Sequence, residues 1–69
     1  MNTFQSNRPV LTLGQFLKVE GLIGSGGEAR FFLMEHTVTV NGVRRTERGA
    51  KLGDSDTVIV DGTAWTIRT

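Results

Sequence analysis

The chain has 69 residues, the size of one small domain, and its formal net charge of +1 does not by itself indicate an acidic or a basic partner. It contains no cysteine, which excludes disulfides and thiolate zinc clusters. No run of about 20 apolar residues occurs, so the sequence predicts no membrane-spanning helix. Residues 1–10 also lack the basic start and apolar stretch of a signal peptide. We therefore expect a cytoplasmic protein in which residues 1–10 form a flexible lead-in and residues 11–69 form a single domain.

The first helix is indicated by apolar residues whose spacing of three and four places them on one helix face, namely Leu13, Phe16 and Leu17. We predict that this helix runs from about residue 13 to residue 20. Thr12 stands where an N-cap is expected, and Gly21 stands where the helix should stop. Gly14 inside the helix costs about 1 kcal/mol relative to alanine, so the helix requires support from tertiary packing.

A second helix is predicted to begin at Ser25, which stands three residues before Glu28 in the spacing of a capping box. In that motif the Ser25 hydroxyl accepts a hydrogen bond from the Glu28 amide, and the Glu28 carboxylate accepts one from the Ser25 amide. The apolar stripe of this helix consists of Ala29, Phe32 and Leu33. The helix should end near residue 35 or 36, where His36 would bind the last carbonyl groups or face water.

Four strands are predicted after the helices, because β-branched residues alternate there and two tight-turn signals, Asn41-Gly42 and Asp61-Gly62, separate them. The predicted strands cover residues 37–40, 43–45, 57–60 and 64–67. Helices that precede a run of strands are typical of an α+β domain. We therefore expect two short helices packed on a small antiparallel sheet.

The glycine-rich segment over residues 24–27 admits two interpretations. The glycines could provide a tight turn between the helices, or they could let a phosphate approach the amides at the start of the second helix. Glu28 would compete with an anion for those amides. No Lys-Ser or Lys-Thr pair follows the glycines, so the segment is not a nucleotide-binding loop.

The sequence offers little for catalysis or metal binding. His36 is the one histidine, and no nucleophile in a distinctive setting accompanies it. One histidine with scattered carboxylates does not match the ligand set of a metal site. We therefore predict that the chain is not an enzyme and has no catalytic residues, no metal, no cofactor and no small-molecule substrate.

Basic residues concentrate in the middle of the chain, where five cations and two acidic residues give residues 30–51 a net charge of +3. The five cations are Arg30, Arg44, Arg45, Arg48 and Lys51. They could form a solvated face, or they could form a nucleic-acid footprint if the fold gathers them on one surface. Because we expect Phe31 to be partly buried, base stacking is disfavoured and recognition of folded RNA through its backbone and shape fits better.

Five segments in this order and spacing resemble the RNA-binding domain of the ribosomal small-subunit protein four type, the "S-four" domain or alpha-L motif. These segments are residues 13–21, 25–30, 38–42, 48–52 and 56–58. The sequences Ser-Gly-Gly-Glu-Ala-Arg and Arg-Gly-Ala-Lys-Leu look most like the stand-alone bacterial branch, whose small one-domain proteins include the YaaA and YbcJ groups. Many members carry arginine where Thr12 and Gly26 stand here.

The resemblance implies that the second helix and the loop after it form an RNA surface. The candidate RNA-binding residues are Ser25, Gly26, Arg30, Arg44, Arg45, Arg48 and Lys51. We expect a non-catalytic, monomeric protein that grips structured RNA, above all ribosomal RNA or a ribosome assembly intermediate. The alternative is a protein-interaction module of the same fold that has lost its affinity for RNA, which the two missing arginines and the low net charge would explain.

Overall fold

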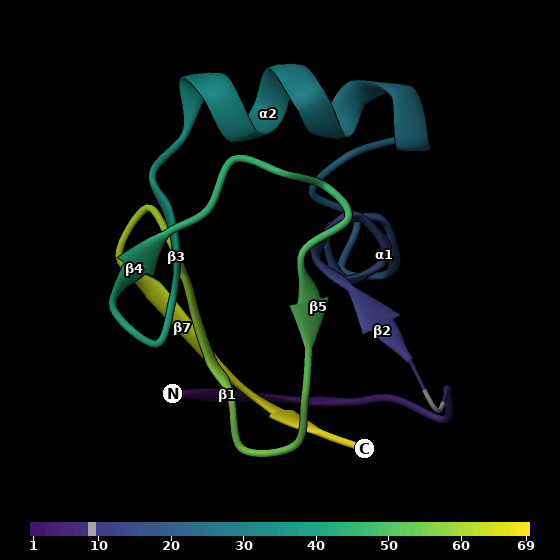
Figure 1. The fold of residues 1–69 in the computed structure, drawn as a ribbon, viewed down its shortest axis with the longest axis vertical. Coiled ribbons are helices and arrows are strands. Elements are labelled where there is room, and N and C mark those ends of the chain that lie inside the picture. Colours follow the sequence, from purple (N-terminus) through teal and green to yellow (C-terminus); the bar gives the residue numbers. More distant parts are fainter. Residues whose placement is uncertain (9) are drawn as a thin grey trace.

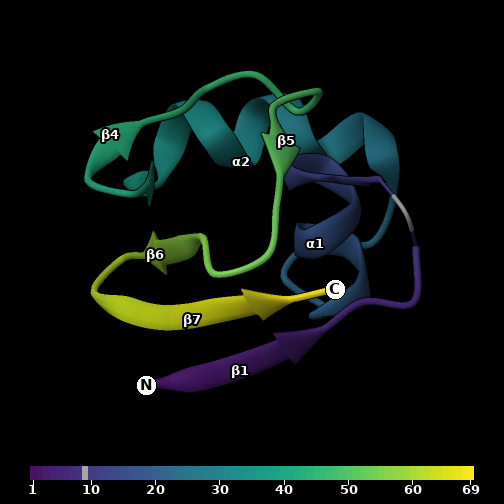
Figure 2. The ribbon, with the colours of Figure 1, turned by 60° about the horizontal axis from the view of Figure 1, so that its bottom comes forward.

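Helices α1 (Leu13–Val19) and α2 (Ala29–Glu35) lie on one face of a mixed β-sheet (Figures 1 and 2). The computed structural model describes residues 1–8 and 10–69. The sheet has five strands in the order β1-β7-β6-β3-β4, and a separate two-stranded sheet joins β2 to β5. The predicted α+β class is therefore confirmed, but the larger sheet is not purely antiparallel, because β1 pairs with β7 in parallel.

The strands of the larger sheet place alternate side chains against the helices. They are β1 (Asn2–Gln5), β3 (Val38–Val40), β4 (Val43–Arg44), β6 (Thr57–Val60) and β7 (Thr63–Arg68). One face of the three central strands contributes apolar residues to the core, namely Val38, Val40, Val58, Val60, Trp65 and Ile67. This alternation is the period of two that the sequence shows in these segments.

Both predicted hairpin turns are present. Asn41 and Gly42 have φ values of 52° and 83°, and Asp61 and Gly62 have φ values of 47° and 88°. Two successive positive φ values are the geometry of a type I′ turn, which matches the twist of the strands that it joins. The Asn41 side chain also holds the start of β6, because its Oδ1 accepts from the Thr57 amide at 3.0 Å.

The N-terminal segment differs from its prediction. The sequence predicts a loose lead-in over residues 1–10, whereas the structure has Asn2–Gln5 as the edge strand β1 beside β7 (Figure 2). Phe4 is buried, and its ring lies 5.0 Å from that of Phe16 in an edge-to-face arrangement. Phe4 is the only apolar residue of this four-residue strand, so the sequence contains no alternation long enough to predict it. Residue 9, which belongs to the same predicted lead-in, lies outside the described residues.

Helix α1 has a defined signal at each end. The predicted N-cap is confirmed, because the Thr12 hydroxyl accepts from the Gln15 amide at 3.3 Å and the Gln15 side chain accepts from the Thr12 amide at 2.9 Å. At the other end Gly21 has a φ of 75° and donates to the carbonyl of Lys18, while Leu22 donates to that of Leu17. These two bonds form a Schellman motif, which explains why the helix stops at the predicted glycine.

The start of α2 is built differently from its prediction. The predicted capping box at Ser25 is wrong, because the Ser25 hydroxyl makes no capping hydrogen bond. The Glu28 amide donates instead to the Ser25 carbonyl at 3.1 Å, and the Glu28 carboxylate accepts from the Gly24 amide at 3.3 Å. The segment Gly26–Glu28 forms a single 3₁₀ turn that leads directly into α2. The glycine segment therefore serves as a tight connection between the helices.

The end of α2 is tied to the second hairpin. His36 Nδ1 lies 2.5 Å from the Asp61 carboxylate, and the imidazole stacks on Phe32 with ring centroids 4.0 Å apart. The Asp61 carboxylate also accepts from the Thr37 amide at 3.0 Å. The sequence predicted that His36 would bind the last carbonyl groups of its helix or face water. Its side chain contacts Asp61 instead. The hydrogen bond from His36, followed by that from Thr37, lowers the pKa of Asp61 below its ordinary value of 3.8.

Candidate nucleic-acid interface

The loop after β4 is fastened to the start of α1. The Leu13 amide donates to the Ala50 carbonyl at 2.8 Å, and the Gly14 amide donates to the Arg48 carbonyl at 2.9 Å. Immediately beyond, β5 (Lys51–Leu52) pairs with β2 (Leu11–Thr12). The first turn of α1 therefore gives two of its amides to this loop, which satisfies donors that a helix start otherwise leaves without partners.

Gly14 is required for this close approach. A Cβ atom at this position would lie 3.2 Å from both the Cβ and the carbonyl oxygen of Arg48. Such contacts are tighter than ordinary van der Waals packing, so a side chain here would push the loop outward. The glycine that weakens α1 as a helix is therefore what allows the Arg48 backbone to be held against it.

The Arg48 side chain reaches from the loop to the connection between the helices. Its Nη1 donates to the Gly26 carbonyl at 3.4 Å, a long hydrogen bond on an exposed side chain. Arg48 therefore bridges three parts of the chain: the loop to which it belongs, the start of α1 and the turn before α2. The backbone of this arginine is fixed, while its guanidinium remains accessible to a ligand.

Two open hollows share Arg48 and Gly49 in their linings, and we call them the Arg48 hollows. The first, of about 330 Å³, is lined by Thr12, Gly14, Gln15, Lys18, Gly26, Arg48 and Gly49. The second, of about 470 Å³, is lined by Gly27, Arg30, Thr46, Glu47, Arg48 and Gly49. The charged residues around the first hollow are both cations, and the second has two cations and one carboxylate. The Arg48 hollows therefore present a locally positive, partly backbone-lined surface suited to an anion.

The structure brings together only part of the predicted basic set. Gly26, Arg30 and Arg48 line the Arg48 hollows, and Ser25 is the exposed neighbour of Gly26. Lys51 stands opposite Thr12 in the two-stranded sheet, at the edge of the first hollow. All three of these cations are exposed.

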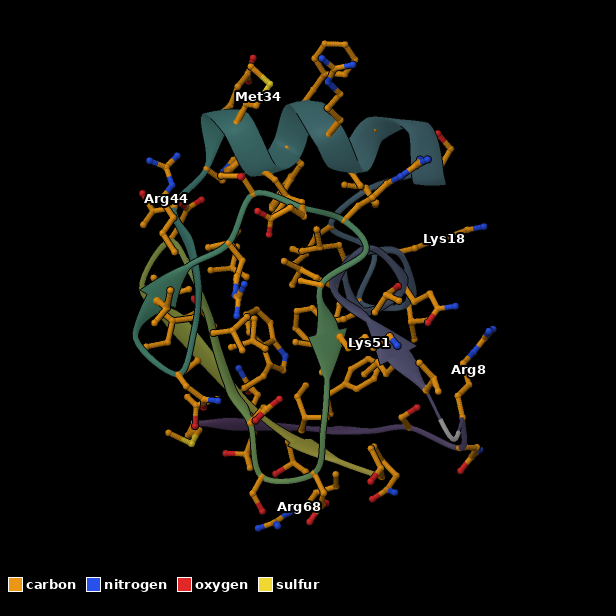
Figure 3. The ribbon with its side chains drawn as sticks, viewed as in Figure 1. Arg8, Lys18, Met34, Arg44, Lys51 and Arg68 are labelled. Atoms are coloured by element: carbon orange, nitrogen blue, oxygen red, sulfur yellow. The ribbon has the colours of Figure 1, made fainter. Side chains whose placement is uncertain are left out.

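Two of the predicted arginines lie elsewhere. Arg44 is in edge strand β4 opposite Thr39, and Figure 3 shows it at the left of the view, with Lys18 at the right and Lys51 between them. Arg45 follows β4 directly, with its amide bound to the Val38 carbonyl at 3.0 Å, and it does not line either hollow. Successive residues of an extended segment point to opposite faces, so Arg44 and Arg45 are not expected to reach the same ligand together.

Lys18 is the cation that the sequence interpretation missed. It lines the first hollow together with Gly14 and Gln15, which precede it by four and three residues. A helix places residues at these spacings on one face, so the polar stripe Thr12, Gln15 and Lys18 was a signal in the sequence.

The expectation that Phe31 is partly buried was wrong. Its side chain is 66% exposed on α2.

Other kinds of site have little support among the described residues. Residues 1–8 and 10–69 contain no group of three or more His, Cys, Asp or Glu side chains that could hold a metal ion. His36 and Asp61 contact each other at the C-terminal end of α2, whereas the Arg48 hollows lie at its N-terminal end. In the described chain, neither helix has the length and apolar character needed to cross a membrane.

Comparison with known proteins places this arrangement in a family. The S4 domain model matches residues 4–68, which is nearly the whole chain. The chain belongs to the S4 domain family. A Bacillus subtilis (strain 168) protein named "Probable ribosome maturation protein RlbA" is 44% identical over 61 residues, covering 88% of this chain and 86% of that protein. No solved structure gives a significant match. The resemblance to the ribosomal small-subunit protein four type is thus confirmed.

Proposed function

We propose that this S4 domain is a non-catalytic RNA-binding protein that grips structured RNA, either ribosomal RNA or a ribosome assembly intermediate. The observation that carries the proposal is the position of Arg48, held by its backbone on α1 and directed between two hollows that also include Lys18 and Arg30. Family membership supports RNA as the ligand, and the name of the Bacillus subtilis relative supports a role in ribosome maturation. We further propose that the protein acts as a cytoplasmic monomer.

The chemistry of the site suits a ribose-phosphate backbone. Guanidinium groups form two parallel hydrogen bonds to phosphate oxygens, and Lys18, which also lines the first hollow, adds a point charge. Because the Arg48 backbone is already fixed, binding needs to order only its side chain, which lowers the entropic cost. The long bond to the Gly26 carbonyl is readily exchanged for a bond to phosphate.

The remaining candidate residues have secondary places in this proposal. Ser25 and Gly26 leave the connection before α2 free of bulky side chains, so an RNA strand can approach the backbone there. Lys51 extends the positive surface along β5. Arg44 and Arg45 would contact RNA only if the strand continues across the molecule toward β4, so we assign the main contacts to Lys18, Arg30 and Arg48.

Crosslinking of the protein to RNA in cells, followed by sequencing of the recovered fragments, tests the proposal. We expect fragments of ribosomal RNA or its precursors, and we expect Arg48→Ala to lose most of the crosslinks. Arg68→Ala is a matched control, because Arg68 is an exposed arginine near Asp54 and lies outside the Arg48 hollows. If no RNA is recovered and a protein partner remains after nuclease treatment, the protein-interaction alternative is correct.

A further inference from the structure

Helix α2 carries two exposed apolar side chains that take no part in the proposed phosphate contacts. Phe31 is 66% exposed and Met34 is 62% exposed. They stand three residues apart, so they are neighbours on one helix face, while Ala29 and Leu33 are fully buried on the opposite side. Figure 3 shows Met34 projecting from α2 away from the sheet.

This apolar face adjoins the second Arg48 hollow. Arg30 lines that hollow and precedes Met34 by four positions within α2. Residues at this spacing are adjacent along a helix, with Cβ atoms about 5–6 Å apart, and Phe31 neighbours Met34 on the same face. A ligand whose phosphate is held by Arg30 and Arg48 therefore has the Phe31 ring within reach of its next group.

We propose that Phe31, supported by Met34, is a stacking platform for one unpaired nucleobase of the RNA whose backbone occupies the Arg48 hollows. This inference rests on the proposed RNA-binding function. It predicts that the protein prefers RNA in which an unpaired base lies beside a paired stem. An aromatic face next to a fixed arginine matches the two chemical parts of a nucleotide, a flat ring and an anion. Glu35, four residues after Phe31 and exposed, disfavours phosphate on the far side of the ring and so sets the direction of the strand.

A protein partner fits this face less well. A fully buried aromatic side chain removes only about 150–250 Å² from water, so two partly exposed side chains supply far less than the roughly 800 Å² per partner of a stable protein interface. The three cations that line the Arg48 hollows, Lys18, Arg30 and Arg48, would also need acidic partners in a protein. A single base with its phosphate is the smaller ligand and matches both features.

The test compares two probes, a fully paired RNA hairpin and the same hairpin with one unpaired adenosine in its stem. We expect the protein to bind the bulged hairpin about 5-fold to 150-fold more tightly, the range for stacking of one base on an aromatic side chain. Phe31→Ala and Phe31→Leu should abolish this preference, whereas Phe31→Trp should retain it. When the unpaired base is 2-aminopurine, its fluorescence should change on binding to the wild type and not to Phe31→Leu. Val19→Ala, at an exposed apolar residue of α1, is the matched control.

The outcomes separate this inference from the proposed function. If both hairpins bind with salt dependence and Arg48→Ala weakens both, but the bulge adds no affinity or Phe31→Leu keeps the full preference, the stacking platform is wrong and RNA binding stands. If neither hairpin binds, both proposals are overturned. If sedimentation shows a dimer that Phe31→Ala dissociates without changing either RNA affinity, the face is an interface between copies of this chain and the stacking inference is wrong.

Discussion

The amide of Gly14 donates to the carbonyl of Arg48 at 2.9 Å, and no side chain separates the two backbones. This contact fastens the loop after β4 to the first turn of α1. Arg48 shares one hollow with Lys18 and the other with Arg30. The functional surface that we propose therefore depends on a glycine that carries no charge and no side chain of its own.

Gly14→Ala should lower both stability and RNA affinity. Alanine favours the helix by about 1 kcal/mol, but its Cβ would overpack against Arg48, which costs about 1–3 kcal/mol. We expect a net loss of about 1 kcal/mol in the free energy of unfolding, measured with urea. Gly49→Ala in the same loop is the control for stability, because a Cβ there meets no atom within 4 Å. A more stable Gly14→Ala protein with unchanged RNA affinity would contradict this account.

Phe4→Ala should cost about 3 kcal/mol of unfolding free energy, because it empties a buried aromatic site against Phe16. Gln5→Ala, at an exposed residue of the same strand, should leave stability nearly unchanged. A domain of this length has a total stability of about 3–10 kcal/mol, so Phe4→Ala is at risk of unfolding. Phe4→Leu keeps most of the volume and should lose about 1 kcal/mol. Equal stability of all three variants and the wild type would show that β1 does not hold the sheet together.

The parts of this fold that the sequence predicted are those with local signals. The type I′ turns at Asn41-Gly42 and Asp61-Gly62 depend on residues that tolerate positive φ, so adjacent positions identify them. The ends of α1 were likewise visible at Thr12 and Gly21. Strand β1 and the β2–β5 pair were not predicted, because short strands owe their pairing to partners more than 35 residues away in the sequence.

In the candidate site too, local sequence signals predicted some residues, while tertiary contacts decide which of them lie together. Arginine-rich composition identified Arg30 and Arg48, but which cations gather depends on the docking of the loop on α1, a tertiary contact made through Gly14. Arg44 was grouped with them from its position in the sequence, whereas it lies on edge strand β4 of the larger sheet, across the molecule from Lys18 (Figure 3). Lys18 comes from a helix that composition did not connect to the basic loop. The capping prediction at Ser25 was wrong because the Glu28 carboxylate binds the Gly24 amide instead.

The Asp61→Asn variant should lose less unfolding free energy than the wild type when the pH is lowered. Because the pKa of Asp61 is lowered in the folded state, its contribution is complete above the ordinary value of 3.8 and is lost as the pH falls through the lowered value. The wild type should therefore lose stability below about pH 4 more steeply than Asp61→Asn. Asparagine tolerates the positive φ of this turn, so the hairpin is retained. Thermal unfolding at a series of pH values measures the difference. If the melting temperatures of the two proteins fall equally as the pH is lowered below about 4, the assigned role of the His36–Asp61 pair is contradicted.

The most direct test of the central claim is the salt dependence of binding to a ribosomal RNA fragment recovered by crosslinking. If Lys18, Arg30 and Arg48 each neutralise one phosphate, the slope of log affinity against log salt should be about −2 to −3. Arg48→Ala should weaken binding and flatten the slope by about 0.7–0.9, whereas Arg68→Ala, which removes the same charge away from the Arg48 hollows, should leave the slope unchanged. Equal flattening by both variants, or none by either, would contradict the claim that Arg48 and its neighbours form the RNA surface.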